Sequence, residues 1–158
     1  MMRIDERLVA FFHRPLMSII AATDACGKPA AGRGIGFHLM EDREGMDVIF
    51  SGWQWPGLVA AIAERGKLAV TFVSPADYVS FQIKGSASLR PTEARDVAEA
   101  DRFIAAAMTE LEGLGVPRGV IMPWLCPQEP RVARLRISEI YVQTPGPLAG
   151  MLAGAAAG

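Results

Sequence analysis

A glycine-rich stretch is the first feature of the sequence that points to chemistry. Gly32-Arg33-Gly34-Ile35-Gly36 lies in an extended pattern, and it lacks the following helix that a dinucleotide-binding loop requires. In a strand the three glycines point to one side, because successive side chains alternate. Their missing side chains leave a flat groove. We expect this groove to hold either a planar ligand or a closely packed neighbouring element.

A second candidate site is the turn that leads from a strand into a helix beginning at Pro56. It reads Ser51-Gly52-Trp53-Gln54-Trp55-Pro56-Gly57. Trp55 stands at the N-cap without a side-chain oxygen, so the first N–H groups of the helix lack a local acceptor. Such a helix start suits a phosphate group, although water or the Ser51 hydroxyl is an alternative partner. Trp53 and Trp55 are either core residues or walls for a flat ring.

Other reaction chemistries find little support in the sequence. It contains two histidines, His13 and His38, and it has neither a G-x-S-x-G motif nor a histidine pair at helical spacing. Cys26 and Cys126 are too far apart for a C-x-x-C motif and could form at most one disulfide. We therefore assign no catalytic residue and expect no metal. A reducing, cytoplasmic location is the simplest interpretation.

Composition limits the class of protein further. The chain has 158 residues, of which 51% are hydrophobic and 21% charged, enough for one domain with a buried core. The sequence contains 16 Lys and Arg residues and 17 Asp and Glu residues. The resulting net charge of −1 argues against a nucleic-acid partner. The longest uncharged apolar stretch, 142–158, is broken by two prolines. We expect neither a signal peptide nor a membrane-spanning helix.

Hydrophobic periodicity predicts six strands and two or three inserted helices. The strands are expected at 16–23, 29–39, 46–51, 68–72, 79–89 and 133–138, and the helices at 3–13, at 56–65, and from an N-cap at Thr92 to Gly113. Residues 117–130 are expected to be irregular. Strands joined by turns favour a mainly β (α+β) antiparallel barrel over a doubly wound sheet. We expect one domain over 1–145, followed by an Ala/Gly-rich tail over 146–158 that frays or lies on a partner.

An ordered series of short segments resembles the pyridoxamine 5′-phosphate oxidase-like family of FMN-binding split barrels. The series consists of Ile19-Ile20-Ala21-Ala22-Thr23-Asp24 with Gly27-Lys28-Pro29, the Arg33 strand, Phe50-Ser51 with its helix, Leu68-Ala69-Val70-Thr71-Phe72, and Phe81-Gln82-Ile83-Lys84-Gly85. The likeness extends over roughly residues 5–143. It implies a six-stranded antiparallel split barrel with peripheral helices. It also implies a flavoprotein oxidoreductase that binds FMN at a homodimer interface.

The resemblance assigns roles to residues of both candidate sites. Arg33 would reach FMN, the backbone from Gly34 to Phe37 would line the isoalloxazine ring, and Ser51 matches a hydroxyl residue at the end of the third strand. The family's phosphate-gripping basic pair is replaced here by Gln54-Trp55-Pro56-Gly57. Arg33, Lys84 and the helix start are expected to compensate. The cofactor-binding residues expected are Arg33, Gly34, Ile35, Gly36, Ser51, Gly52, Trp53, Gln54, Gly57, Gln82 and Lys84.

Three functions remain open at this point. The first is an FMN-dependent oxidoreductase, related to pyridoxamine 5′-phosphate oxidase, that acts on a small organic molecule. The second is a non-catalytic protein whose degenerate site holds haem, another planar ligand or nothing, with His38 as the candidate axial ligand for haem. The third is a purely structural barrel dimer. Phe11, Phe12, Trp53 and Trp124 exceed what a small monomer readily hides, which favours a two-fold homodimer. The sequence specifies neither substrate nor electron donor.

Overall fold

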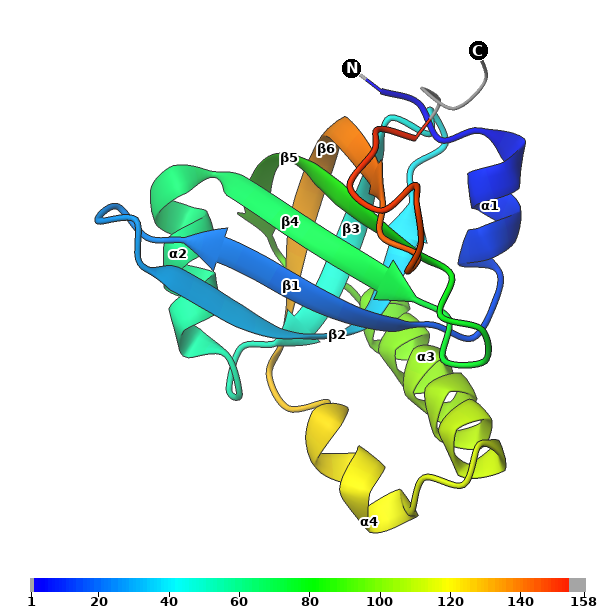
Figure 1. The fold of residues 1–158 in the computed structure, drawn as a ribbon. Helices are drawn as coiled ribbons and strands as arrows, with labels where there is room; N and C mark the ends of the chain where they lie inside the picture. Colours follow the sequence, from blue (N-terminus) through cyan, green and yellow to red (C-terminus); the bar gives the residue numbers. More distant parts are fainter. Residues whose placement is uncertain (1, 154–158) are drawn as a thin grey trace.

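Alternating hydrophobic residues produce six strands, and these close into one barrel. The strands are β1 (Met17–Thr23), β2 (Pro29–Leu39), β3 (Gly45–Ser51), β4 (Lys67–Val73), β5 (Ser80–Arg90) and β6 (Pro130–Val142). They follow the order β1-β2-β3-β6-β5-β4 around the barrel, and every neighbouring pair is antiparallel. The computed structural model describes residues 2–153 (Figure 1). The predicted fold class, a mainly β six-stranded antiparallel barrel with helices, is confirmed.

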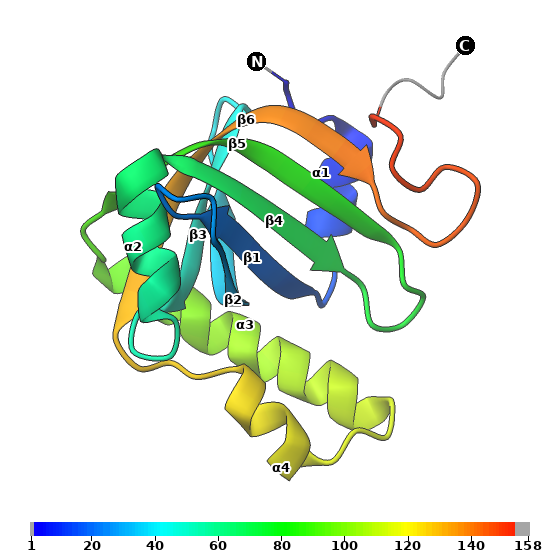
Figure 2. The ribbon, with the colours of Figure 1, turned by 60° about the vertical axis from the view of Figure 1, so that its left-hand side comes forward.

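The helices cover the barrel unevenly. They are α1 (Glu6–Phe12), α2 (Pro56–Arg65), α3 (Ala94–Gly113), α4 (Arg118–Ile121) and the 3-10 helix η1 (Met122–Trp124). Figures 1 and 2 show α2 at one end of the strands and α1 at the other. The long helix α3 packs against β2, and α4 lies beside the far end of α3. The outer side of β1 and β4, which faces the viewer in Figure 1, carries no helix.

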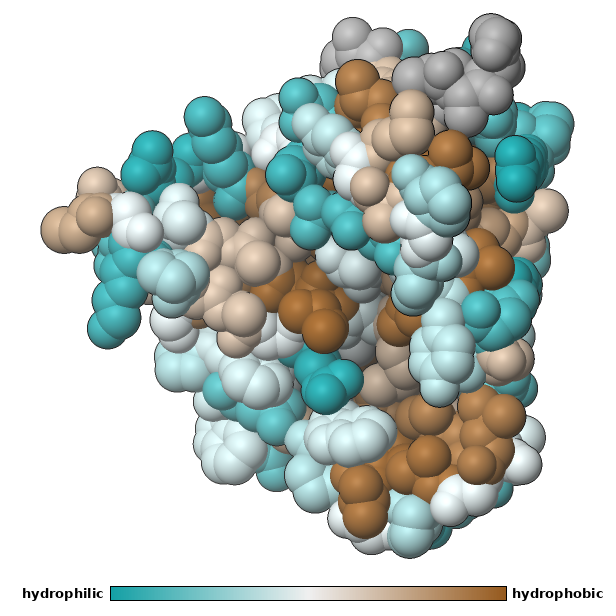
Figure 3. Space-filling model, in the orientation of Figure 1, coloured by the Kyte–Doolittle hydropathy of each residue, from teal (hydrophilic) through white to brown (hydrophobic). Residues whose placement is uncertain are grey.

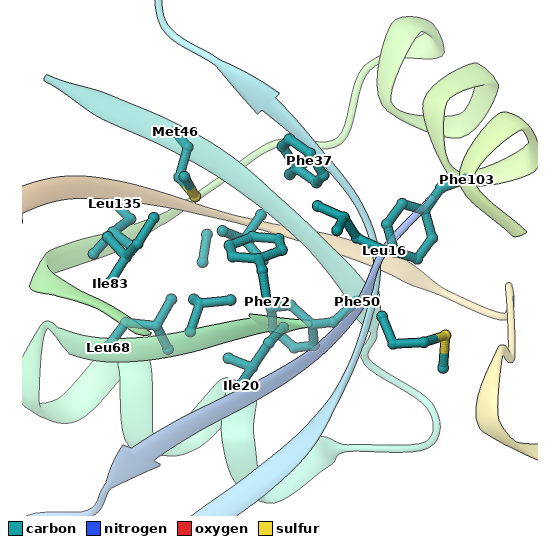
Figure 4. Close-up of a cluster of buried hydrophobic side chains, with 14 of the residues drawn as sticks. Leu16, Ile20, Phe37, Met46, Phe50, Leu68, Phe72, Ile83, Phe103 and Leu135 are labelled. Carbon is teal, nitrogen blue, oxygen red and sulfur yellow. The ribbon is translucent and has the colours of Figure 1, made fainter. Parts of the chain in front are cut away.

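Every second side chain of each strand points into the barrel, and these side chains fill its interior. Ile20, Phe50, Phe72 and Ile83 are fully buried and belong to one hydrophobic cluster (Figure 4). Phe72 also meets Phe12 of α1 edge to face, with ring centroids 5.1 Å apart. Such aromatic pairs add stabilisation beyond the area that they bury. The barrel core and the helix at its end are therefore one packed unit.

Four predictions about the bounds of elements differ from the structure. The first helix is shorter than expected because Asp5 caps it, accepting a 2.8 Å hydrogen bond from the Leu8 N–H. Glu93 rather than Thr92 caps α3, while the Thr92 hydroxyl donates to the Pro130 carbonyl instead. The final strand is longer than expected, and the stretch expected to be irregular contains α4 and η1. Two of these differences reflect which of several neighbouring residues caps a helix. The others depend on contacts with residues that are distant in sequence.

The glycine strand departs from the predicted geometry at a β-bulge. Gly34 pairs with Phe50 and Gly36 with Ile49, so Ile35 is an extra residue that reverses the alternation. A Cβ on Gly36 would lie 3.5 Å from Ala100 of α3. The expectation that all three glycines face one side is therefore wrong.

The other two glycines of β2 face buried protein groups. A Cβ on Gly32 would lie 2.6 Å from the Trp55 ring, and one on Gly34 would collide with the Ser18 hydroxyl. These two glycines therefore make room for neighbouring side chains, as the close-packing alternative predicts. Within residues 2–153, no open groove lies over them.

The C-terminal tail folds back on the barrel as far as it is described. The N–H of Gly150 donates to the Val142 carbonyl at 2.7 Å, and the N–H of Ala153 donates to the Ile140 carbonyl at 2.8 Å. The expectation of fraying is wrong for 146–153, whereas 154–158 lie outside the described residues. None of the described helices combines the length and apolarity needed to cross a membrane.

Candidate functional site

Two rows of residues cross the side of the barrel that no helix covers. Direct pairing across β2, β1, β4, β5 and β6 gives a first row of Arg33, Ile19, Thr71, Gln82 and Tyr141. The same registers give a second row of Ala31, Ala21, Ala69, Lys84 and Glu139. Directly paired residues, and residues two apart on one strand, share a face of a sheet. We call the surface made by these ten residues the open face.

The open face is apolar and flat at its centre. The Ile19 side chain is 48% exposed there, which is unusual for a large apolar residue in a sheet. Ala21, Ala31 and Ala69 lie on the same face, and a groove of about 710 Å³ is lined by Ala21, Ala69 and Lys84 and by Arg65 and Lys67, where α2 leads into β4. Figure 3 shows this side of the molecule, with apolar and polar groups intermixed. A groove with apolar lining and a few polar groups is typical of a ligand site.

Two predicted cations stand at opposite margins of the open face. The guanidinium of Arg33 lies 4.7 Å from the centre of the Trp124 ring, and the ammonium of Lys84 lies 4.8 Å from the centre of the Tyr141 ring. Arg33 and Lys84 lie on strands that are three apart in the barrel, about 14 Å across the sheet. Each cation is drawn toward the aromatic ring on its own side. The structure therefore does not bring Arg33 and Lys84 together on a single anion.

Arg33 keeps its hydrogen-bonding capacity in this arrangement. Among residues 2–153 its guanidinium makes neither a hydrogen bond nor an ion pair. A guanidinium stacked on an aromatic ring retains N–H donors in its plane, where they suit a phosphate. At the other margin, the Gln82 amide donates to the Thr71 hydroxyl at 3.2 Å. Desolvation and the neighbouring Glu139 raise the pKa of Tyr141, so its hydroxyl stays protonated at neutral pH.

The predicted phosphate donors after β3 are occupied by protein groups. The buried Ser51 hydroxyl donates to the Gln128 carbonyl at 2.7 Å and accepts from the Gln54 N–H at 3.1 Å. The Gln54 side-chain amide donates to the Pro123 carbonyl at 2.7 Å. Gly52 is equally constrained, because a Cβ there would lie 2.6 Å from the Arg131 side chain. In this conformation these residues hold the η1 region rather than an anion.

The start of α2 matches the prediction in part. Trp55 is the N-cap and offers no side-chain acceptor, and Pro56 is the first helical residue. One of the first N–H groups of the helix, that of Leu58, is not free but donates to the Trp55 carbonyl at 3.1 Å. The Gly57 N–H makes no hydrogen bond within the described part of the chain. Trp55 packs as a core residue, whereas Trp53 is 61% exposed and remains available as a wall.

His38 does not lie on the open face. Its Nε2 atom lies 3.3 Å from an oxygen of Asp96, which is fully buried in the first turn of α3. Asp96 also accepts 2.7 Å hydrogen bonds from the Arg90 guanidinium, and this interaction lowers its pKa to about 2. The axial role of His38 stays a prediction, and its ring lies against the charge cluster beneath α3 rather than on the open face. Among residues 2–153, no three His, Cys, Asp or Glu side chains gather as metal ligands.

Comparison with solved structures places this geometry in a known fold. HupZ of Group A Streptococcus is 19% identical, with 93% of this chain and 99% of that chain covered at a TM-score of 0.56. HutZ, the heme storage protein from Vibrio cholerae, is 15% identical over 89% and 95%, with a TM-score of 0.53. A pyridoxamine 5′-phosphate oxidase-related, FMN binding protein from Nostoc punctiforme is 16% identical over 85% and 81%, with a TM-score of 0.51.

The chain has the fold of the FMN-binding split barrels. The fold implied by the resemblance is thus confirmed. No protein-family model and no curated protein matches the sequence. At identities below 20%, the likeness shows the split-barrel architecture alone. Which ligand this split barrel binds depends on its own residues.

Sequence reasoning predicted only Arg33, Gln82 and Lys84 of this split barrel's open face. It missed Ile19, Thr71 and Tyr141 among the others, and also Trp124 at the margin. The alternation of β1 could have shown Ile19 as an outward apolar residue. Nothing local shows that Trp124 reaches Arg33, because that contact depends on the path of η1. The predicted cofactor-binding set stays a prediction. Arg33, Gln82 and Lys84 lie on the open face, whereas Ser51 and Gln54 lie behind it in contact with the η1 region.

Proposed function

We propose that the open face binds FMN and that the protein is an FMN-dependent oxidoreductase acting on a small organic molecule. The observation that supports this most strongly is the Arg33 guanidinium, which is held over Trp124 at the edge of a flat apolar floor with its donors free. A cation with free donors beside an exposed apolar surface matches a ligand that has a flat ring and a phosphate. The fold likeness to the FMN binding protein from Nostoc punctiforme adds support.

The residues present fit the two ends of FMN differently. Ile19 and the alanines of the open face offer a surface for a flat ring, and Gln82 and Lys84 offer polar groups beside it. The phosphate would be held by Arg33, whose guanidinium keeps its donors free. A single cation binds phosphate less strongly than a pair of cations, so the affinity should be modest. Bound FMN supplies hydride transfer, while the chain supplies position and exclusion of water.

Binding of a planar ligand without catalysis is the second candidate function. It is favoured by the fold likeness to HutZ, the heme storage protein from Vibrio cholerae. Against haem, His38 is engaged with Asp96, and Nδ1 of His13 lies 2.9 Å from the Val9 carbonyl of α1. The open face itself contains no histidine. FMN therefore fits the open face better than haem does.

Replacing Arg33 with alanine should weaken FMN binding by about 1.5–3 kcal/mol, the scale of a hydrogen bond to a charged group. Riboflavin, which lacks the phosphate, should bind the wild type and Arg33→Ala with equal affinity. The measurement is quenching of flavin fluorescence on titration with protein. Arg3→Ala is the matched control, since Arg3 is an exposed arginine near the N-terminus, outside the open face. Equal FMN affinity in Arg33→Ala and wild type would remove Arg33 from the site.

We also propose that a second copy of the chain covers the open face in a two-fold homodimer. The exposed side chains of Ile19 and Trp53 are large apolar groups that a partner would bury. We expect an interface well above about 1,000 Å² in total. Light scattering should give twice the mass of one chain across a wide concentration range. The mass of a single chain throughout that range would contradict the dimer.

A further inference from the structure

The segment that carries Trp124 is anchored on both sides of this residue, and the ring packs partly buried against the core. Ile121 and Leu125, its neighbours in α4 and after η1, are buried in the main core. The Pro123 carbonyl accepts from the Gln54 amide, and the Gln128 carbonyl accepts from the Ser51 hydroxyl, both at 2.7 Å. Trp124 is therefore presented by a segment anchored through packing and through two hydrogen bonds.

The Arg33 side chain, in contrast, has one fixed neighbour. The Trp124 ring, 4.7 Å from the guanidinium carbon, is its aromatic partner, and no carboxylate or carbonyl in residues 2–153 holds it. A long side chain on an outer sheet face otherwise samples many rotamers, and fixing them on binding costs free energy. Stacking on a fixed ring removes part of that cost before the ligand arrives.

We infer that Trp124 is the positioning residue that presents Arg33 to the phosphate of a flavin nucleotide, and so sets the preference for FMN over riboflavin. This inference rests on the proposed function. Trp124 acts through Arg33: the ring holds the guanidinium plane, and the in-plane N–H groups donate to the phosphate. Ser51 and Gln54 contribute by anchoring the segment that presents Trp124, although neither donates to the anion.

The test compares FMN with riboflavin in three single variants. Trp124→Leu should weaken FMN binding about 5- to 30-fold, the range expected when a cation–π contact is lost at a partly buried site. Riboflavin affinity should stay unchanged in the same variant. Trp124→Phe retains an aromatic face and should recover FMN affinity to within about 3-fold of wild type. Val120→Ala is the matched control, because Val120 is exposed in α4 and contacts neither cation, and it should leave the FMN-to-riboflavin ratio unaltered.

A double variant separates positioning from simple support of the fold. Because Trp124 acts through Arg33, Arg33→Ala combined with Trp124→Leu should bind FMN no more weakly than Arg33→Ala alone. Additive losses, or an equal loss for riboflavin, would overturn the positioning role while leaving the proposed function standing. An unchanged FMN-to-riboflavin ratio in Trp124→Leu would also overturn it. If the wild type binds FMN no better than riboflavin, the proposed phosphate site itself fails.

Discussion

Replacing Arg90 with leucine should lower the free energy of unfolding by about 3–5 kcal/mol. The Arg90 guanidinium donates to Asp47 of β3 and to Asp96 of α3, with the shortest contact to each at 2.7 Å, and both carboxylates are buried. Asp47 would keep Arg134, at 2.9 Å, but Asp96 would keep no arginine. A buried carboxylate without its partner cation is strongly unfavourable. Because these ion pairs also join α3 to the barrel, the substitution should destabilise the whole domain rather than α3 alone.

Urea unfolding of Arg90→Leu and wild type measures this effect. Arg95→Leu is the control, because its side chain is 54% exposed and lies 3.7 Å from Asp47. A contact of this length, from an arginine that is largely exposed to solvent, should contribute no more than about 1 kcal/mol. A loss below about 1 kcal/mol in Arg90→Leu would show that the cluster beneath α3 is not required for stability.

The same cluster gives stability a dependence on pH. The pKa of Asp96 is lowered from 3.8 to about 2, chiefly by its hydrogen bonds with Arg90. The folded state therefore binds a proton less readily than the unfolded state, and the stabilisation is fully present above pH about 4. It should decline by about 2 kcal/mol as the pH falls from 4 toward 2. This decline should be absent in Arg90→Leu.

The strands and helices could largely be read from the sequence because they depend on local patterns. In β4, the apolar residues Leu68, Val70 and Phe72 alternate with outward ones, and the strand forms as expected. Pro56 and Gly66 bound α2, since proline suits a first helical position and Gly66 adopts a left-handed φ of 60°. Such signals need no knowledge of distant partners.

The candidate site could be predicted in residue types but not in contacts. The bulge at Ile35 is set by the pairing of β2 with β3, and it turns Gly36 and His38 toward α3. Ser51 was expected to bind phosphate, yet its hydroxyl finds the Gln128 carbonyl, whose position depends on the path of η1. Strand register and loop path are tertiary properties, and a single sequence does not display them.

Binding of FMN on the open face is tested most directly by placing a charge at the centre of that face. Ile19→Glu should lower FMN affinity by at least about 30-fold, because binding would then desolvate a carboxylate and bring it toward an anionic ligand. Ile19 is 48% exposed, so this substitution should leave the barrel core intact. Val97→Glu, at a 44% exposed position on α3, is the matched control.

The measurement is a titration of each protein with FMN, followed by the absorption spectrum of the bound flavin. Wild type and Val97→Glu should each bind one FMN per chain with the same affinity, and Ile19→Glu should show little bound flavin at those concentrations. Thermal unfolding of all three proteins confirms that they are folded. Wild-type affinity in Ile19→Glu, or no FMN binding by the wild type, would contradict the assignment of the open face as a flavin site.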